Sequence, residues 1–97
     1  MLAYLVIREG SKWTDVFRLV PGQVVTIGRA PTNHIVVKDE RCSRYHAEIF
    51  MTDGAWTIRD LDSRNGTFLN TLPARNTKVH TGDQIRAGNN EWRVEQR

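Results

Sequence analysis

The sequence has few of the features that mark secreted or membrane proteins. It holds one cysteine, Cys42, so no disulfide forms within the chain, and this suits a reducing compartment. The apolar run at the start covers only residues 1–7. A membrane-spanning helix needs about 20 apolar residues, and a secretory signal needs a longer apolar core and a cleavage site. We therefore expect a cytoplasmic protein with no membrane partner.

Helical periodicity and a strong net charge are also missing. No window of about ten or more residues repeats its apolar positions with the period of an amphipathic helix. Fourteen Lys and Arg against eleven Asp and Glu give a net charge of +3. This surplus is modest and spread along the chain, so it permits an anionic partner but does not indicate nucleic acid.

The sequence is instead built of short runs of β-branched and aromatic residues separated by turn formers, a pattern typical of strands. Its 97 residues suit one domain over residues 1–97, which we expect to be part of a longer protein. The pattern predicts an all-β fold, an antiparallel β-sandwich of about ten to eleven short strands with ligand loops at one end. The predicted strands are residues 3–7, 16–20, 23–27, 34–37, 47–51, 56–59, 67–69, 77–80, 83–87 and 91–95.

Local patterns add detail to this prediction. Thr52-Asp53-Gly54 separates two predicted strands and reads as a hairpin loop, with glycine where a positive φ is needed. In the strand that follows, alternation turns Trp56 to one side and Thr57 to the other. We expect Trp56 and Trp92 in the core, since three dispersed tryptophans form no platform for stacking bases.

Polar residues gather in three loops beside predicted strands, namely residues 27–33, 39–46 and 60–67. A sandwich brings such loops together at one end. Guanidinium forks donate paired, charge-assisted hydrogen bonds that suit a phosphate dianion, and serine hydroxyls add further donors. The arginines and serines concerned are Arg29, Arg41, Ser43, Arg44, Ser63 and Arg64.

Three motifs in these loops carry a family resemblance. Gly28-Arg29, Ser43-Arg44-Tyr45-His46 and Asn65-Gly66-Thr67-Phe68-Leu69-Asn70 resemble the Gly-Arg, Ser-x-x-His and Asn-Gly-Thr pattern of forkhead-associated (FHA) domains. Asp60-Leu61 and Thr81-Gly82-Asp83-Gln84-Ile85 are similar to that family too. The resemblance spans nearly the whole chain and implies an SMAD/FHA-like sandwich that binds phosphothreonine peptides.

The resemblance also implies roles for the loop residues. Arg29 and Ser43 would contact the phosphate, and Arg44 would add a further phosphate contact. Asn65 would bond the peptide backbone beside the phosphothreonine, and Arg64 would line the same groove.

Three further positions follow from the resemblance, and a fourth follows from a turn signal. Arg41 falls where the family often reads the third residue after the phosphothreonine. Gly28 and His46 would be architectural, the glycine by letting its loop turn and the histidine by tying loop to loop. Asn65-Gly66 is first of all a turn signal, so Gly66 is assigned a structural role. In one departure, the family often follows its second asparagine with glycine, whereas Asn70 here precedes Thr71.

Other classes of site fit poorly. The histidines and Cys42 lack the paired short spacing of zinc ligands, and a calcium-loop reading of Asp60-Leu61-Asp62 lacks its terminal glutamate. Ser43 and His46 have no strained elbow or third group that would make them catalytic. We expect no metal, no cofactor and no enzymatic activity.

The expected partner is a threonine-phosphorylated protein or peptide. The protein would act as a signalling adaptor or regulatory domain, transcription regulation included, as a monomer or weak dimer that does not bind nucleic acid directly. Two alternatives stay open: a phosphate-independent scaffold that dimerises through a sheet face, and a nucleic-acid-binding domain suggested only by the basic balance.

Overall fold

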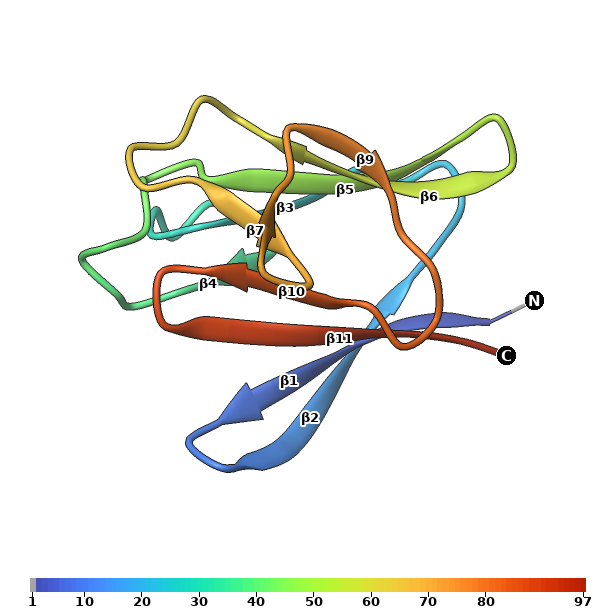
Figure 1. Cartoon of the computed structure of the whole chain (residues 1–97), viewed down its shortest axis with the longest axis horizontal. Coiled ribbons are helices and arrows are strands. Elements are labelled where there is room, and N and C mark those ends of the chain that lie inside the picture. Colours follow the sequence, from blue (N-terminus) through green and yellow to red (C-terminus); the bar gives the residue numbers. More distant parts are fainter. Residues whose placement is uncertain (1) are drawn as a thin grey trace.

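The strands of the computed structural model, which describes residues 2–97, form two sheets packed face to face (Figure 1). The six-stranded sheet has the order β2-β1-β11-β10-β7-β8, and the five-stranded sheet has the order β4-β3-β5-β6-β9. The strands are β1 Ala3–Glu9, β2 Lys12–Leu19, β3 Val25–Gly28, β4 Ile35–Val36, β5 Ala47–Thr52, β6 Ala55–Asp60, β7 Thr67–Leu69, β8 Leu72–Pro73, β9 Asn76–Lys78, β10 Gln84–Ala87 and β11 Asn90–Gln96. The prediction of an antiparallel β-sandwich is confirmed.

Neighbouring strands are antiparallel except β3 and β4, which run parallel. Within residues 2–97 the backbone contains strands, turns and loops, and no helix is long and apolar enough to cross a membrane.

Alternating side chains from the two sheets fill the core. In β10 the pattern is regular: Ile85 and Ala87 are buried while Gln84 and Arg86 are exposed. Trp56 and Trp92 are each 2% exposed, which confirms that both belong to the core. Burying each large apolar side chain stabilises the fold by roughly 1.5–3 kcal/mol relative to leaving it in water. The other large core residues are Leu5, Val25, Ile27, Ile49, Ile58 and Val94.

The strand bounds differ from the predictions in several places, and one buried side chain was not expected. The two-residue strand β8 was not predicted, because two residues are too short for a periodic pattern. The hairpin between β1 and β2 turns over Gly10 and Ser11 alone, so both strands are longer than predicted. Thr57 does face away from the core, yet it is only 3% exposed, because Phe50 lies opposite it and the Arg59 guanidinium stacks on that ring.

Two hairpin turns adopt the same backbone conformation from different sequences. Asp53 and Gly54 have φ values of 50° and 75°, and Asn70 and Thr71 have the same pair of values. Two residues with positive φ match the twist of the flanking strands. The departure at Thr71 therefore leaves the turn in place but puts a β-branched residue in the left-handed region.

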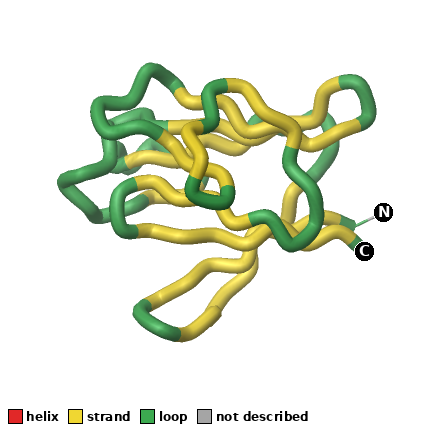
Figure 2. Tube along the Cα trace, in the orientation of Figure 1, coloured by secondary structure: helices red, strands yellow, loops and turns green. Residues whose placement is uncertain are grey.

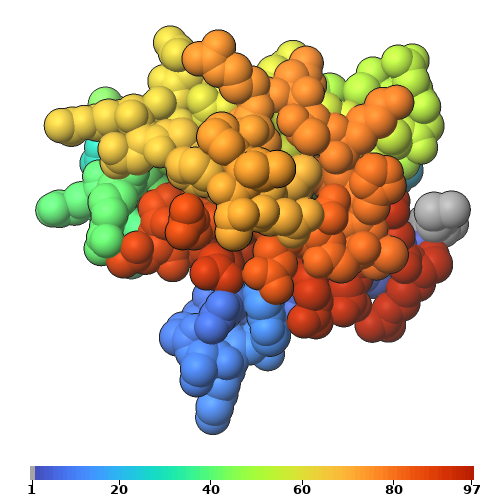
Figure 3. Space-filling view, in the orientation of Figure 1, coloured from blue at the N-terminus to red at the C-terminus, as the bar shows by residue number. Residues whose placement is uncertain are grey.

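The loops that hold the predicted site lie together at one end of the sandwich, and the two chain ends lie at the other (Figure 1, Figure 2). The β1–β2 hairpin projects from the body of the molecule (Figure 3).

Candidate functional site

The strand register brings the three polar loops together. Ala47, the first residue of β5, pairs with Ile27 near the end of β3 and with Asp60 at the end of β6. The ends of β3, β5 and β6 therefore lie side by side. The loops that leave or enter them there are residues 29–34, 37–46 and 61–66. Because antiparallel neighbours fix these positions, the core determines where the loops begin.

The first two loops are joined by backbone hydrogen bonds that continue past the strands. The amides of Arg29 and Ala30 donate to the carbonyls of Ser43 and Arg44, each at 3.0 Å. The Asn33 amide group also donates to the Arg44 carbonyl at 2.8 Å. A Cβ at Gly28 would lie 2.3 Å from that same oxygen, so only glycine allows this close approach.

His46 connects the second loop to the third from a fully buried position. Its Nδ1 accepts a hydrogen bond from the Ser43 backbone N–H at 3.0 Å, and its Nε2 lies 2.8 Å from the Gly66 carbonyl oxygen. A backbone N–H only donates, so Nδ1 must be unprotonated and Nε2 must carry the hydrogen that reaches Gly66. The ring thus fixes Ser43 and Gly66 relative to each other.

The third loop is held by Asp60. Its carboxylate accepts hydrogen bonds from the Ser63 backbone at 3.1 Å, from the Ser63 hydroxyl, and from the Thr67 hydroxyl at 2.7 Å. Burial alone would raise the pKa of Asp60, but these hydrogen bonds outweigh it and the pKa lies below its usual range. The Ser63 hydroxyl also accepts from the Gly66 amide at 3.0 Å, so it is occupied inside the loop and is not a free donor.

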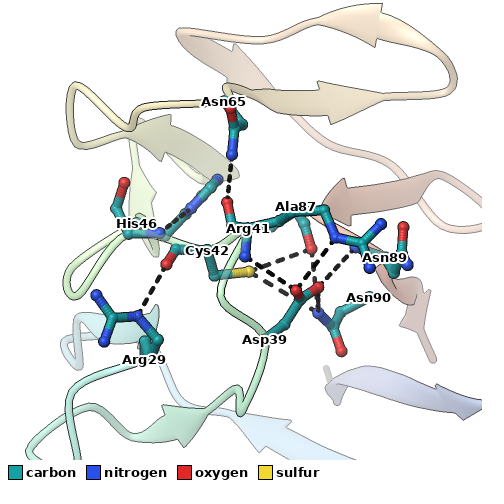
Figure 4. A network of polar contacts seen from close by, with 10 residues as sticks. Arg29, Asp39, Arg41, Cys42, His46, Asn65, Ala87, Asn89 and Asn90 are labelled. Atoms are coloured by element: carbon teal, nitrogen blue, oxygen red, sulfur yellow. Dashed lines mark hydrogen bonds and ion pairs between the residues drawn. The ribbon is translucent and has the colours of Figure 1, made fainter.

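A fourth segment supports the second loop from its other side, and sequence reasoning missed it (Figure 4). Asp39 accepts hydrogen bonds from the Asn89 amide at 2.9 Å, in the turn between β10 and β11, and from the side chain of Asn90, the first residue of β11, at 3.0 Å. It also accepts from the Arg41 amide at 3.0 Å. The Asn89 and Arg41 hydrogen bonds lower the pKa of Asp39.

Part of this support had a local signal. An aspartate that bonds the amide two residues on forms an Asx turn, which the order Asp39-Glu40-Arg41 permits. The link to residues about fifty positions away had none. Cys42 packs beneath the same segment, where its thiol lies 3.4 Å from the Ala87 carbonyl oxygen, and burial raises its pKa.

The predicted ligand residues project from this hydrogen-bonded frame. Arg29, Arg44 and Arg64 are exposed. Within residues 2–97 the Arg29 guanidinium makes one hydrogen bond, from Nε to the Cys42 carbonyl at 3.2 Å, and its outer nitrogens point away from this contact (Figure 4). Among residues 2–97 the side chains of Arg44 and Arg64 have no hydrogen-bond or ion-pair partner. The Ser43 hydroxyl accepts from the Arg64 amide at 2.9 Å, which leaves its own hydrogen to donate.

Asn65 and Arg41 meet across the gap between the second and third loops (Figure 4). The Asn65 side-chain amide donates to the Arg41 carbonyl at 2.8 Å. One amide hydrogen is used in this way, and the carbonyl oxygen of the Asn65 side chain makes no hydrogen bond within residues 2–97. Arg41 is less free, because its Nε lies 3.4 Å from Asp39. All of the predicted site residues therefore lie at one end of the sandwich.

Comparisons with known proteins show what the chain as a whole is similar to. The family model described as FHA domain matches residues 25–88. An oxoglutarate dehydrogenase inhibitor of Corynebacterium efficiens is 35% identical over 86 residues, which cover 89% of this chain and 60% of that protein. The FhaB protein of Mycobacterium tuberculosis is 35% identical over 86 residues, covering 88% of this chain and 55% of its own. The chain thus spans less than two thirds of the length of these relatives.

Solved structures show the same fold. A chain from a study of phosphothreonine-dependent FHA domain interactions superposes with a TM-score of 0.89 at 30% identity, covering all of this chain and 98% of that one. EmbR of Mycobacterium tuberculosis, solved in complex with a low-affinity phosphopeptide, gives a TM-score of 0.85 at 29% identity, covering 97% of this chain and 24% of that one.

Proposed function

Because this chain belongs to the FHA domain family, we propose that it binds phosphothreonine peptides of a partner protein through the loop end of its sandwich. The observation that carries the proposal is that three exposed arginines adjoin Ser43, whose backbone is fixed by His46. The Arg29 amide donates to the Ser43 carbonyl, the Arg64 amide donates to the Ser43 hydroxyl, and Arg44 is the next residue in the chain. A phosphate dianion carries about −1.5 to −2 charge at pH 7 and has three acceptor oxygens. Hydrogen-bond donors that are already held in place lose little conformational entropy when the phosphate binds.

Each residue has a proposed part in binding. Arg29 and the Ser43 hydroxyl donate to the phosphate, and Arg44 adds a further contact. Arg64 lines the groove. Asn65 bonds the peptide backbone with its second side-chain N–H and its side-chain carbonyl oxygen, since the first N–H is donated to Arg41.

Selectivity would come from Arg41 at the third residue after the phosphothreonine. Gly28, His46 and Gly66 hold the loops and do not touch the ligand.

The expected affinity follows from these contacts. Charge-assisted hydrogen bonds contribute about 1.5–3 kcal/mol each. Two or three of them, with backbone contacts and less the cost of ordering the peptide, give a dissociation constant in the micromolar range, about −8 kcal/mol. An unphosphorylated peptide loses most of this free energy, so a kinase sets whether the partner binds.

The same proposal covers the domain and its setting. Residues 1–97 act as one binding domain without catalytic chemistry, in the cytoplasm, as a monomer or weak dimer within a signalling or transcription-regulating protein. The partner is a phosphorylated polypeptide and not nucleic acid or membrane.

The test is a phosphothreonine-oriented peptide library screened beside an unphosphorylated copy, followed by calorimetry on the best sequence. We expect micromolar binding that requires the phosphate. Equal binding of the unphosphorylated peptide would instead support a phosphate-independent scaffold. Phosphate-insensitive binding of an oligonucleotide with a steep salt dependence would support the nucleic-acid alternative.

A further inference from the structure

The outer face of the six-stranded sheet carries a surplus of positive charge. Strand register turns Tyr4, Val6 and Arg8 of β1 outward, together with the residues paired to them across the sheet. Five arginines against two glutamates project from this face, a surplus of three charges. The arginines are Arg8, Arg18, Arg86, Arg93 and Arg97, and the glutamates are Glu91 and Glu95.

The opposite face of the sandwich differs. On the outside of the five-stranded sheet, Arg59 is ion-paired with Glu48, and Lys78 adds one further charge. With one pair that cancels and one lysine, these residues give the five-stranded face a surplus of one charge, against three on the six-stranded face. We call the outer side of β1, β2, β10, β11 and β7 the basic face.

Aromatic rings on the basic face lie beneath guanidinium groups. Arg8 and Arg93 lie over the Trp13 ring, 5.6 and 4.8 Å from its centre, and Arg86 lies 4.9 Å from the centre of Phe68. Stacking orders a guanidinium and does not use its N–H edge. Arg8 and Arg93 already bond Glu91 and Glu95 with that edge, whereas Arg86 makes no hydrogen bond or ion pair from its side chain within residues 2–97 and can bond a carboxylate of a partner. Stacking also occupies the ring, which disfavours the base stacking used to hold single-stranded nucleic acid.

The basic face contains two shallow hollows. One of about 250 Å³ is lined by Tyr4, Val16, Glu95 and Arg97, and a smaller one of about 90 Å³ is lined by Asn70, Thr71, Gln84, Arg86 and Glu91. Val16 is 57% exposed on the projecting β1–β2 hairpin (Figure 3). Each hollow is lined by one arginine and one glutamate beside uncharged residues. The larger one, beside Tyr4 and Val16, suits an apolar side chain, and an arginine at each hollow can pair with a carboxylate of the ligand.

We propose that the basic face is a second binding surface, one that takes an acidic, unphosphorylated segment of a protein. Charge complementarity selects the acidic partner, and the exposed Val16 and the hollows select one that also carries apolar side chains. A nucleic acid would find the rings of this face already covered by guanidinium groups, and phosphodiester or lipid headgroups would leave Val16 without an apolar contact. The surface is separate from the phosphate-binding loops, so the protein can hold two segments at once.

The test is a titration of isotope-labelled protein with a synthetic peptide in which pairs of glutamates flank leucine or tyrosine. A second peptide with glutamine at every glutamate is the control ligand. We expect amide shifts in β1, β2, β10 and β11, little response to the glutamine peptide, and weaker binding as salt rises. Arg18→Glu and Arg86→Glu should each weaken binding roughly five- to tenfold, while Lys78→Glu, the same charge change on the other sheet, should not.

Three results would overturn the proposal: shifts confined to residues 29–46 and 61–66, equal effects of the arginine variants and Lys78→Glu, or tighter binding of an oligonucleotide or of anionic lipid vesicles than of the glutamate peptide. Phosphopeptide affinity is measured on the same variants and should be unchanged. If the acidic peptide does not bind the basic face, phosphopeptide binding at the loop end is unaffected. If the phosphopeptide does not bind the loop end, the acidic peptide can still be tested on the basic face.

Discussion

Arginines occur in two settings in this protein. At the loop end, Arg29, Arg44 and Arg64 project from loops fixed by buried hydrogen bonds, and all three are exposed. On the basic face, arginines lie on aromatic rings, and Arg8 and Arg93 are ion-paired to glutamates.

The difference shows how one residue type serves two kinds of ligand. A phosphate dianion concentrates its charge in one small group, so it is bound best by several donors that converge without competing anions. A stacked and partly neutralised arginine has less to gain from a single anion. Many of them spread over a face favour a partner whose charge is also spread out.

The largest effect should come from removing one unpaired guanidinium at the loop end. Arg29→Ala loses two charge-assisted hydrogen bonds of about 1.5–3 kcal/mol each, so phosphopeptide affinity should fall by about a hundredfold or more. Arg29→Lys should also lose much of the affinity, because a point charge does not replace a paired fork. Calorimetry with one phosphothreonine peptide measures both.

Arg86→Ala is the matched control for this prediction, since it removes the same charge from the basic face. Arg86→Ala should bind the phosphopeptide with the same affinity as the unaltered protein. Retained binding in Arg29→Ala, or an equal loss in Arg86→Ala, would mean that the phosphate does not bind where we place it.

A smaller effect should separate phosphothreonine from phosphoserine at the same loops. The two differ by one methyl group, whose burial is worth about 1–3 kcal/mol, or roughly 10–200-fold. The methyl also restricts χ1, so less rotamer freedom is lost on binding. Phosphotyrosine should bind poorly, because its ring holds the phosphate too far from the chain for Asn65 to reach the peptide backbone. Calorimetry on three otherwise identical peptides tests this, and equal affinity for phosphoserine would rule out a methyl pocket.

The frame should respond differently from the ligand groups. His46→Ala removes the bridge between the Ser43 amide and the Gly66 carbonyl and leaves both buried groups without their partner. The free energy of unfolding should fall by about 1–3 kcal/mol, and phosphopeptide affinity should fall with it. Thermal unfolding and calorimetry on the same variant test the two together. Unchanged melting with lost binding would place His46 in contact with the ligand.

The sequence predicts the position of the loops but not most of the hydrogen bonds that hold them. The strands and the end at which the loops meet follow from local patterns, because alternation and turn residues act over a few positions. The support from Asp39 to Asn89 and Asn90 does not, because it depends on how two distant loops pack. The hydrogen bond from the Ser63 hydroxyl to Asp60 was also missed. A serine in a loop can either donate to a ligand or bond within its own turn, and the sequence around Ser63 permits both.

Acid should separate binding from folding. Asp60 has a lower pKa in the folded protein than in the unfolded chain, so its stabilising contribution is complete above about pH 4 and is lost as the pH falls through the folded value. The second pKa of a phosphate is about 6, so phosphopeptide binding should already weaken between pH 7 and 5. The difference in unfolding free energy between the protein and Asp60→Asn, measured from pH 7 to 3, should be constant above about pH 4 and should narrow below it. A difference that stays constant over the whole range would contradict the role given to Asp60.

The smallest effect should come from Thr71, whose side chain makes no hydrogen bond within residues 2–97, so that a substitution there acts mainly through the backbone conformation. Its φ of 75° is rare for a β-branched residue, and the left-handed region costs about 1–2 kcal/mol for a residue with a Cβ. Thr71→Gly relieves that strain but adds freedom to the unfolded chain, which offsets roughly half of the gain. A net stabilisation of about 0.5–1 kcal/mol should raise the melting temperature by a few degrees and leave phosphopeptide affinity unchanged. Gly54 has the same φ in the other hairpin turn, so Gly54→Thr should lower the melting temperature by a similar amount. If Thr71→Gly melts lower than the unaltered protein, then the Thr71 side chain contributes contacts at the small hollow of the basic face that outweigh its strain.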